Sequence, residues 1–508
     1  MKRSRLLAAA LVLLLAGTLV GTDPLSTTTS VAGGQQRVAD EPEPWPAPGG
    51  AGSGVRNAVV FLVDDMSDFS CSQVHDFLPE SSAWLKDRGT CYETASTSTP
   101  VCCPARAQVQ TGQLAHNNRV RTQLDARHLD VSHTVQHDLG EAGLTTYGVG
   151  KNLNGVDAAN YYGPGAMSNG FDDFDFWNSY KNAPGSFLLY ADDGSTYVPT
   201  DGLHSTETNG AFLDDKLDGY LETGERFFVY DAFFAPHKQG VGGGQGVMPL
   251  PTPAHAQAAV PPFYYAPEPE ARDKLPLFAK PRRTRAFYQH LWTQRIRALY
   301  DVDHQMASVF AKLETAGVLD ETAVIFASDN GYTDRGQVNW DGKAIPYPAS
   351  TDVPMLAWYP GAAPAVVRKP VQLVDIAPTL YDVLGVTPGH RLDGHSLRGG
   401  HTRKQVYGEF FGERDSLVDE ESGRATGYVS SWRLLKQGRW SYVEWYRPEG
   451  TILRRELYGE PRMLANMLWP GYRGRRPKPS LVRYLHQQLV AQSRCAGTVE
   501  DGWVRPCT

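Results

Sequence analysis

The chain lacks the features that define several simple protein classes. Its 508 residues include only six cysteines, too few for a scaffold that depends mainly on disulfides. It has no closely spaced cluster of cysteine and histidine, so a zinc site is not expected, and no repeat of solenoid period is visible. What remains is an ordinary globular protein.

The chain also has no large excess of charge of one sign. The formal net charge is -7 at pH 7, which gives no general attraction to nucleic acid or to anionic membranes. We therefore expect no nucleic-acid partner, and any anion must be bound at a local site. Hydrophobic residues make up 41% of the chain, enough for one large domain and a smaller one.

Only the N-terminus carries a long apolar run. Residues 1–22 place basic side chains ahead of one apolar run from Leu6 to Val20, the pattern of a secretory signal peptide. The run is short for a membrane-spanning helix and has no cysteine near its end for lipid attachment. We expect export, with no stable membrane partner. Residues 23–55 are rich in Ser, Thr, Gly and Pro, which predicts a disordered linker.

The cysteine positions raise a question about one pair. Spacing favours disulfides between Cys495 and Cys507 and between Cys71 and Cys91. The two remaining cysteines, Cys102 and Cys103, are adjacent. A bridge between sequence neighbours requires a strained eight-membered ring, so at least one of these thiols needs another explanation.

Three apolar runs each end at polar residues, as strands buried on both faces of a parallel sheet do. They are Ala58–Val63, the run beginning at Phe227, and Ala323–Ala327. Between the last two, apolar residues follow helical spacing from Ile296 to Leu313, and Gly317 ends the pattern. This alternation predicts an α/β domain over residues 56–402, with a doubly wound, mostly parallel sheet flanked by helices.

After about residue 403 the residue pattern changes. Segments such as "WRLLKQGRWSYVEWY" and "TILRRELYG" alternate along the chain and are rich in Trp and Tyr. Alternation of this kind is typical of antiparallel strands. We expect a smaller C-terminal antiparallel-sheet subdomain over residues 403–508.

Oxygen-bearing side chains follow two of the predicted strands. Asp64 and Asp65 come after the first, and Asp329 and Asn330 come after the third. The carboxyl ends of parallel strands form the open rim of such a sheet, and an all-oxygen ligand set suits calcium or magnesium. The alternative is that each residue simply caps a helix or a turn.

The adjacent cysteines belong to a recognisable pattern. "CCPAR" contains Cys-x-Pro-x-Arg, beginning at Cys102 and ending at Arg106, and here the chain resembles the type I sulfatases, whose maturation signal is that pattern. Further stretches match the family's motifs, in the same order along the chain, over roughly residues 57 to 400. The sequences of these motifs are most similar to those of glucosamine-6-sulfatases and related extracellular carbohydrate sulfatases. The matching stretches are "FLVDDMSD", "TGQLAHNNRV", "GVGKNLNG", "FFAPHK", "IFASDNGY", "VQLVDIAPTLYDVLGV" and "RLDGHSL".

The resemblance implies a role for each site residue. A formylglycine-generating enzyme would convert Cys102 to formylglycine (3-oxoalanine), whose hydrate attacks sulfur and expels the substrate alcohol. Arg106 would stabilise the converted residue. The metal, calcium with magnesium as the alternative, would be held by Asp64, Asp65, Asp329, Asn330 and the converted Cys102. Lys151, His237 and Lys343 would surround the sulfate, where positive charge offsets charge on the bridging oxygen and a His or Lys can protonate the leaving alcohol.

The sequence differs from the family pattern at two positions, and several of the residues also have simpler interpretations. Lys151 is not followed two residues later by the histidine of many sulfatases, and no histidine lies between Asn330 and Lys343, which leaves the general acid open. Both lysines are also compatible with solvated loops. His116 is either a supporting group of the site or a turn residue. Gly240–Met248 lacks a P-loop lysine and is interpreted as a flexible insertion.

Three functional hypotheses follow. The first is a secreted, formylglycine-dependent sulfatase acting on a sulfated sugar or small molecule. The second is a phosphomonoester or phosphonate hydrolase of the same superfamily, whose metal-dependent phosphatases usually need two metals and extra histidine ligands. The third is a non-catalytic protein that binds sulfated glycans and leaves Cys102 unconverted. The basic run "GYRGRRPKPS" is either solvated surface or a contact for a polyanionic substrate.

Overall fold

The structure is a computed structural model, and it describes most of the chain beyond the N-terminal segment. The described residues are 54–153, 170–178, 188–191, 196–197, 202–239, 248–265, 271–278, 283–399, 403–412, 430–497 and 507. The predicted signal peptide, almost all of the predicted linker and residues 240–247 of the glycine-rich loop lie outside them. None of the helices in the described ranges is both long and apolar enough to span a membrane.

A ten-stranded sheet forms the centre of the larger domain. Its strand order is β11-β2-β10-β9-β1-β8-β4-β5-β6-β7. The pairs that join β9, β1, β8, β4 and β5 are parallel, and antiparallel pairs occur towards both edges. The strands are β1 (Asn57–Val63), β2 (Thr90–Tyr92), β4 (Thr145–Gly150), β5 (Asp173–Asn178), β6 (Leu188–Ala191), β7 (Thr196–Tyr197), β8 (Phe227–Ala232), β9 (Thr322–Ser328), β10 (Met355–Trp358) and β11 (Ala365–Val367). A separate two-stranded pair joins β3 (Ala95–Ser96) and β12 (Val371–Gln372).

The three predicted strands are confirmed as β1, β8 and β9, and they are neighbours. Every residue of each is buried, because the sheet is covered on both faces. Val63 at the end of β1 pairs with Ser328 at the end of β9, and Leu62 pairs with Ala232 of β8. The three strands therefore end at one edge, where the polar residues that follow them meet.

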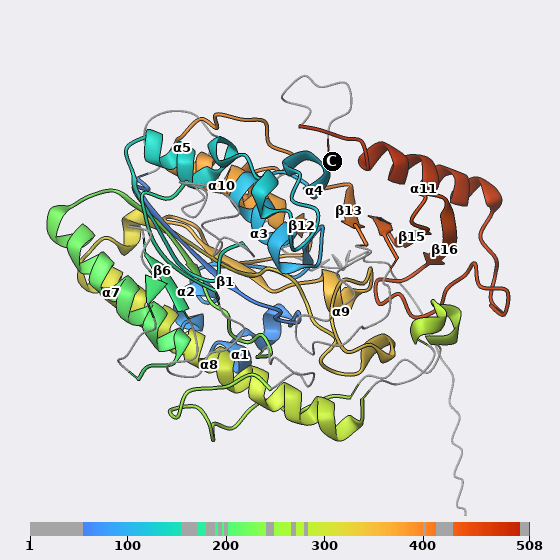
Figure 1. Cartoon of the computed structure of the whole chain (residues 1–508), viewed down its shortest axis with the longest axis horizontal. Helices are drawn as coiled ribbons and strands as arrows, with labels where there is room; N and C mark the ends of the chain where they lie inside the picture. Colours follow the sequence, from blue (N-terminus) through green and yellow to red (C-terminus); the bar gives the residue numbers. More distant parts are fainter. Residues whose placement is uncertain are drawn as a thin grey trace, which may run out of the picture. The chain divides into compact units, whose positions relative to one another are not determined.

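Helices cover both faces of this sheet, as the doubly wound prediction requires. In Figure 1, α3, α5 and α10 lie above the sheet and α7 and α8 lie below it. The described α-helices are α1 (Val74–Phe77), α2 (Ser82–Leu85), α3 (Cys102–Thr111), α4 (Ala115–Asn118), α5 (Val135–Glu141), α7 (Ser205–Thr223), α8 (Arg285–Thr315), α9 (Pro348–Thr351), α10 (Ile376–Leu384) and α11 (Pro479–Gln492).

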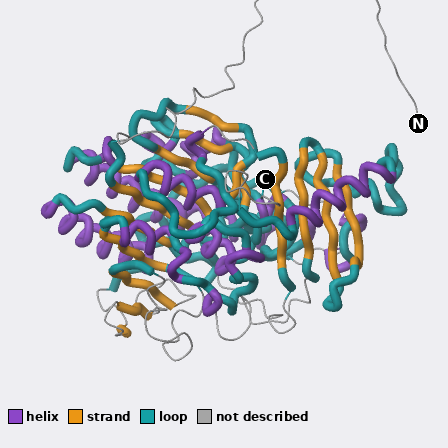
Figure 2. Tube along the Cα trace, turned by 90° about the horizontal axis from the view of Figure 1, so that it is seen from above, coloured by secondary structure: helices purple, strands orange, loops and turns teal. Residues whose placement is uncertain are grey.

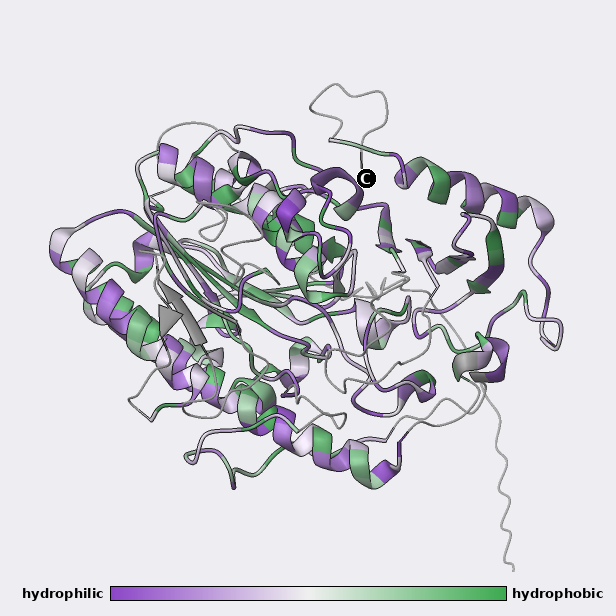
Figure 3. Cartoon of the chain, in the orientation of Figure 1, coloured by the Kyte–Doolittle hydropathy of each residue, from purple (hydrophilic) through white to green (hydrophobic). Residues whose placement is uncertain are grey.

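Each face has its own apolar core. Val59 and Phe61 of β1 point to the cluster that contains the apolar stripes of α7 and α8. Val60 and Leu62 point to the cluster formed with α3, α5 and α10, since side chains alternate along a strand. Figure 3 shows the green and purple residues alternating along α7 and α8, as expected for amphipathic helices with one solvated face.

The predicted antiparallel C-terminal sheet is present. It has four strands, which Figure 2 shows side by side with a helix across them. The helix is α11, which contacts β14, and the sheet's other face packs on residues that follow β9, including Trp340 and Tyr347. The strands are β13 (Gln405–Phe410), β14 (Trp432–Gln437), β15 (Trp440–Tyr446) and β16 (Ile452–Tyr458).

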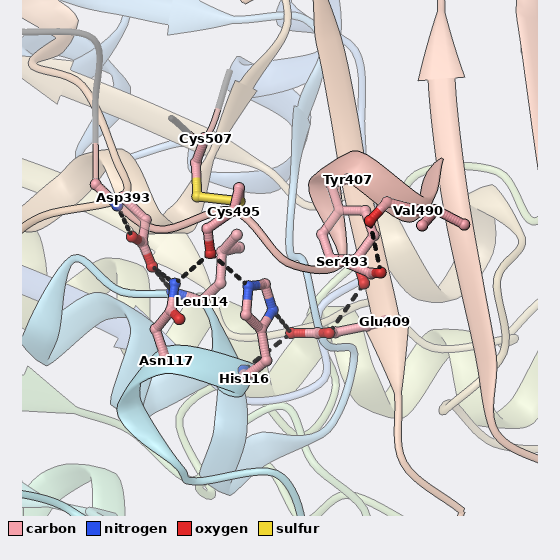
Figure 4. The surroundings of a disulfide bond; sticks show 11 residues. Leu114, His116, Asn117, Asp393, Tyr407, Glu409, Val490, Ser493, Cys495 and Cys507 are labelled. Atoms are coloured by element: carbon pink, nitrogen blue, oxygen red, sulfur yellow. Dashed lines mark hydrogen bonds and ion pairs between the residues drawn. A yellow bond between two sulfur atoms is a disulfide. The ribbon is translucent and has the colours of Figure 1, made fainter. Parts of the chain in front are cut away.

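Both predicted disulfides are confirmed. Cys71 is bonded to Cys91 and Cys495 to Cys507, whereas Cys102 and Cys103 are free thiols. The second disulfide lies where the C-terminal segment returns to the larger domain (Figure 4). There the carbonyl of Cys495 accepts hydrogen bonds from His116 and Asn117 of α4, at 3.1 Å each.

Candidate active site

The acidic residues that follow β1 and β9 are brought together at the strand ends. Asn330 donates from Nδ2 to Asp65 Oδ1 at 2.5 Å, and the backbone N–H of Asp65 donates to Asp329 Oδ1 at 3.1 Å. Asp64, Asp65, Asp329 and Asn330 are all fully buried. The contacts agree with the prediction that two neighbouring parallel strands deliver their polar ends to one place.

Helix α3 presents the cysteine motif to this cluster. Cys102 is its first residue, and its Sγ lies 3.2 Å from Asp64 Oδ1. Arg106, four residues later and hence on the same helix face, donates from Nε to Asp329 Oδ2 at 2.9 Å. The spacing of the motif therefore places the thiol and the guanidinium against carboxylates from two different strands.

Cys103 faces the other way. It packs in a small apolar cluster with Ala107, Val120 and Leu153, and its backbone N–H donates to Gln123 Oε1 at 2.9 Å. The two adjacent thiols thus have different surroundings, since one lies among charged groups and the other among apolar side chains.

Two lysines flank the Cys102 sulfur. Lys151, just after β4, is hydrogen-bonded to Asp64 Oδ2, and its Nζ lies 3.5 Å from Cys102 Sγ. Lys343 places its Nζ 2.8 Å from the same sulfur and 2.5 Å from Asp65 Oδ1. Their side chains are 7% and 13% exposed, so neither is a solvated loop lysine.

His237 completes the group. It follows β8, is almost fully buried, and its Nε2 lies 3.4 Å from Asp65 Oδ2. Its Nδ1 contacts the backbone carbonyl of Lys238. Because a carbonyl only accepts, Nδ1 carries the proton and Nε2 is the acceptor atom of the neutral ring.

Burial and neighbouring charge set the protonation states. Burial alone would raise the pKa of Asp64, but Lys151 and the other nearby cations outweigh it and hold that pKa well below its usual value. Burial, reinforced by Asp64, raises the pKa of the Cys102 thiol well above its usual value. Burial also lowers the pKa of His237 to about 3. At neutral pH the thiol and the imidazole are uncharged.

The residues fit a hard divalent cation. Asp65 Oδ2 and Asn330 Oδ1 are buried oxygens without a hydrogen-bond partner, which leaves their lone pairs available to a metal. One ligand atom from each of Asp64, Asp65, Cys102 and His237 lies within 4.8 Å of the others. Over the described ranges this is the single such group of three or more His, Cys, Asp or Glu residues.

Sequence reasoning missed Arg295 of α8. This fully buried arginine donates to the backbone carbonyl of Asp65 and, at 3.3 Å, to that of Pro236. Asp65 has a φ of 65°, a left-handed conformation that non-glycine residues seldom adopt, and Arg295 helps to hold it. The signal was present, because Arg295 lies on the apolar stripe between Leu291 and Leu299 where a solvated arginine would not be expected.

A second missed group lies beside His237. Lys238 is buried, bonds to Tyr332 and donates to Asp341 Oδ1 at 2.8 Å. Asp341 lies in the segment between Asn330 and Lys343 where a histidine is absent from the sequence. His116 lies elsewhere, since it contacts Glu409 of β13 and the Cys495 carbonyl.

Comparison with known proteins agrees with this geometry. The sulfatase family model matches residues 56–386, which include every candidate site residue. The chain belongs to the sulfatase family. Its match thus covers the ten-stranded sheet and its helices, and it ends before the C-terminal sheet begins.

Individual sulfatases show how far the likeness extends. The extracellular sulfatase SULF-1 homolog of Drosophila melanogaster is 29% identical over 359 residues, which cover 67% of this chain and 31% of the fly protein. Human N-acetylglucosamine-6-sulfatase is 26% identical over 408 residues, covering 73% of this chain and 70% of the human protein. The chain therefore spans less than half the length of its extracellular sulfatase relatives.

Solved structures share the fold. One, in complex with its substrate D-glucosamine-2-N,6-O-disulfate, has a TM-score of 0.64 and 18% identity, covering 86% of this chain and 96% of that one. A phosphonate monoester hydrolase from Silicibacter pomeroyi has a TM-score of 0.62 and 20% identity, covering 86% and 95%. The shared fold thus extends over most of this chain and nearly all of both solved chains.

Proposed function

We propose that this protein hydrolyses sulfate monoesters, with an O-sulfated carbohydrate of the glucosamine-6-sulfate type as substrate. The observation that carries the proposal is the position of Cys102, whose Sγ lies among Asp64, Lys151 and Lys343 at the N-terminus of α3. The names of the relatives support the substrate class, since they include N-acetylglucosamine-6-sulfatase, and one structural neighbour was solved with a sulfated glucosamine.

The proposal assigns Cys102 as the precursor of formylglycine. When present, that aldehyde supplies a hydrated nucleophile that an ordinary serine or cysteine cannot provide. The surroundings of Cys102 suit such a group, because Lys343 and Lys151 can hold an oxygen in place of the sulfur. Cys103, packed against Ala107 and Val120, fills the variable position of the motif.

The cationic side chains have complementary roles. A sulfate ester carries spread negative charge, and Lys151 and Lys343 approach the reacting position from two loops, where they offset charge that develops as the ester bond breaks. Arg106 reaches Asp329 from the same helix face as Cys102, so it fixes both the helix and the carboxylate.

Lys343 and His237 have different proposed roles in turnover. Lys343 Nζ carries protons and is the more exposed of the two lysines, so it is placed to donate to the leaving alcohol. His237 Nε2 is an acceptor atom, because Nδ1 is held against the Lys238 carbonyl, so it can accept a hydrogen bond at the site while the lowered pKa of the ring keeps it uncharged. This assignment fills the role left open by the missing histidine before Lys343.

A divalent cation completes the proposed site. Calcium, or magnesium in its place, would be held by Asp64, Asp65, Asp329, Asn330 and the converted Cys102, and would supply positive charge that polarises the sulfate and lowers the pKa of a bound hydroxyl. The unpartnered oxygens of Asp65 and Asn330 support this ligand set.

The proposal includes export and a maturation partner. Two disulfides and the N-terminal sequence pattern support an oxidising, extracytoplasmic destination. A formylglycine-generating enzyme would act on Cys102 before the protein reaches that destination.

Intact-mass analysis of the peptide containing Cys102 tests the proposal together with activity assays. Conversion of the thiol to an aldehyde lowers the mass by about 18 Da, as the change in covalent formula requires, and the converted protein should cleave an aryl sulfate and 6-O-sulfated glucosamine. An unmodified thiol in protein made by its native host would favour a non-catalytic glycan-binding protein. Faster cleavage of a phosphonate or phosphate ester than of the matched sulfate would favour the phosphoesterase reading.

A further inference from the structure

The segment from residue 461 to residue 497 has a charge distribution unlike that of the rest of the chain. It contains no aspartate or glutamate, although the whole chain has 56 acidic residues against 49 lysines and arginines. Its cationic residues are all exposed. They are Arg462, Arg473, Arg475, Arg476, Lys478, Arg483 and Arg494. An acid-free stretch of this length on an acidic protein produces a local positive surface.

These cations are not used to stabilise the fold. Over the part of the chain that the structure describes, none of the seven forms an ion pair with a carboxylate, and Arg476 donates only to the backbone carbonyl of Pro470, at 2.6 Å. Lys478 is also the N-cap residue of α11, where positive charge opposes the helix dipole. Local stability therefore does not explain their presence.

A cleft lies at the start of this segment. Its volume is about 360 Å³, and it runs along the edge strand β16. It is lined by an indole ring, two arginines and an amide, from Trp469, Arg454, Arg455 and Asn466, together with apolar groups such as Leu453. The Trp469 ring lies close over the backbone of Gly471, since a Cβ added there would come within 2.4 Å of it. An indole can stack on a sugar ring, and the remaining guanidinium N–H groups of Arg454 and Arg455, which also pair with Glu456 and Glu444, can bind sulfate oxygens.

The cleft and the basic segment are physically connected. Pro470 lines the cleft and also accepts the hydrogen bond from Arg476. On the other side, Arg455 of the cleft and His486 of α11 both contact Glu444 Oε1, at 3.0 and 2.8 Å. In Figure 1, β16 and α11 lie together at the right of the picture, away from β1.

We propose that the Trp469 cleft and the basic surface of residues 473–494 form a second binding site, for a sulfated polysaccharide chain. In naming a sulfated glycan it rests on the proposed function, but the site is separate from the catalytic one. The combination favours a glycan over nucleic acid or a membrane, because the aromatic ring lines a cleft beside guanidinium groups instead of projecting from the surface. The site would retain a polymeric substrate while its sulfate esters are cleaved elsewhere.

Binding is measured on the full chain carrying Cys102→Ala, so that no probe is hydrolysed and the result does not depend on the proposed activity. The probe is a heparin oligosaccharide in low salt. The triple variant Arg473→Gln/Arg475→Gln/Lys478→Gln should bind about tenfold or more weakly and with a shallower salt dependence. The matched control Arg368→Gln/Lys369→Gln/Lys404→Gln, which removes three exposed cations elsewhere, should bind like its parent.

Further measurements distinguish a sulfated glycan from the other possible ligands, nucleic acid and anionic membranes. Trp469→Ala should weaken heparin binding while leaving the salt dependence unchanged, since it removes stacking and no charge. Converted protein carrying the triple substitution should keep its kcat/KM for an aryl sulfate and lose it for a sulfated polymer. Equal heparin binding by the triple variant and the control would overturn the proposal. So would tighter binding of duplex DNA, or of phosphatidylserine vesicles, than of heparin.

Discussion

Lys343 Nζ lies 2.8 Å from Cys102 Sγ, although 241 residues separate the two in the chain. The segment that carries Lys343 is held by the C-terminal sheet, because Trp432 Nε1 of β14 donates to the carbonyl of Ala344 at 2.9 Å. Val338, Trp340 and Tyr347 of the same segment pack in that sheet's apolar cluster. The smaller sheet thus positions a lysine of the active site from outside the larger domain.

Trp432→Phe tests this relationship. Phe keeps a smaller aromatic ring but loses the donor to Ala344, so we expect kcat/KM for an aryl sulfate to fall about tenfold, while the lost hydrogen bond and the small cavity lower the unfolding free energy by about 2 kcal/mol. Trp292→Phe is the control, since its Nε1 donates to Pro261, a residue outside this segment. A loss of activity that is no larger than in the control would contradict a positioning role.

The two free thiols should respond differently to substitution. Cys102→Ala removes the proposed nucleophile, and we expect sulfatase activity to fall by about a thousandfold or more. Cys103→Ala leaves a small cavity among Ala107 and Val120, which should cost about 1 kcal/mol of stability and leave kcat within a few-fold. Steady-state assays and chemical denaturation measure both. An equal loss of activity in Cys103→Ala would mean that the wrong cysteine has been assigned as the nucleophile precursor.

Calcium should stabilise the protein through Asp65 and Asn330. Calcium at about a hundred times its Kd adds about 2.7 kcal/mol to the unfolding free energy, which thermal denaturation with and without chelator detects independently of activity. Asn330→Ala removes a proposed ligand and should abolish the shift. Asp214→Asn, at an exposed ion pair with Lys312, should keep it. The same titration with magnesium decides between the two ions, and a shift that survives Asn330→Ala would argue against the ligand set.

Gly150, which directly precedes Lys151, lies too close to the backbone of β8 for any side chain. Its φ is 90°, and an added Cβ would lie 2.0 Å from the Ala232 carbonyl oxygen. Gly150→Ala should therefore destabilise the protein by more than about 3 kcal/mol and displace Lys151. Gly143→Ala, with a φ of 83° and nothing within 4 Å, should cost only about 1 kcal/mol. Similar midpoints in urea for the two variants would refute this account.

The contact between His116 and Glu409 predicts a pH dependence of stability. Burial alone would lower the pKa of His116, but Glu409, 2.8 Å away, outweighs it and raises that pKa. The stabilisation from this histidine is then complete below its unfolded pKa, about 6.5, and is lost as the pH rises through its raised folded value. For Glu409, burial would raise the pKa, but His116 outweighs it and lowers it, so its contribution is lost only in acid.

His116→Gln should thus destabilise the protein by about 2 kcal/mol at pH 6 and by clearly less at pH 9. Unfolding midpoints of the variant and the parent at the two pH values provide the comparison, and the same difference at both would rule out the charged pair. Figure 4 shows why the contact matters, because His116 also reaches the carbonyl of Cys495 beside the C-terminal disulfide.

Much of the fold followed from local patterns. Continuous apolar runs identified β1, β8 and β9, and helical spacing with Gly317 identified α8, because burial on two faces or on one stripe leaves a periodic signature. The meeting of Asp65 with Asn330 was predictable for the same reason, since neighbouring parallel strands end at one edge. The two disulfides followed from spacing.

Other features depend on long-range packing that no local pattern reports. The short strands β2, β10 and β11 join the sheet through pairings between distant segments, and the contact of α4 with β13 joins His116 to Glu409, 293 residues away. The position of Arg295 on the apolar stripe of α8 indicates that it is buried, but its partner, the carbonyl of Asp65, is known only once α8 is docked on the sheet.

The complete burial of Cys102 at the start of α3 has a consequence for the order of events in biosynthesis. A separate enzyme must bind the residues around the side chain that it oxidises, and here all ten residues of α3, including Cys102 to Arg106, are buried. The conversion proposed for this residue must therefore precede folding. A host that lacks the converting enzyme during synthesis would yield a correctly folded but permanently inactive protein, which later exposure to that enzyme would not rescue.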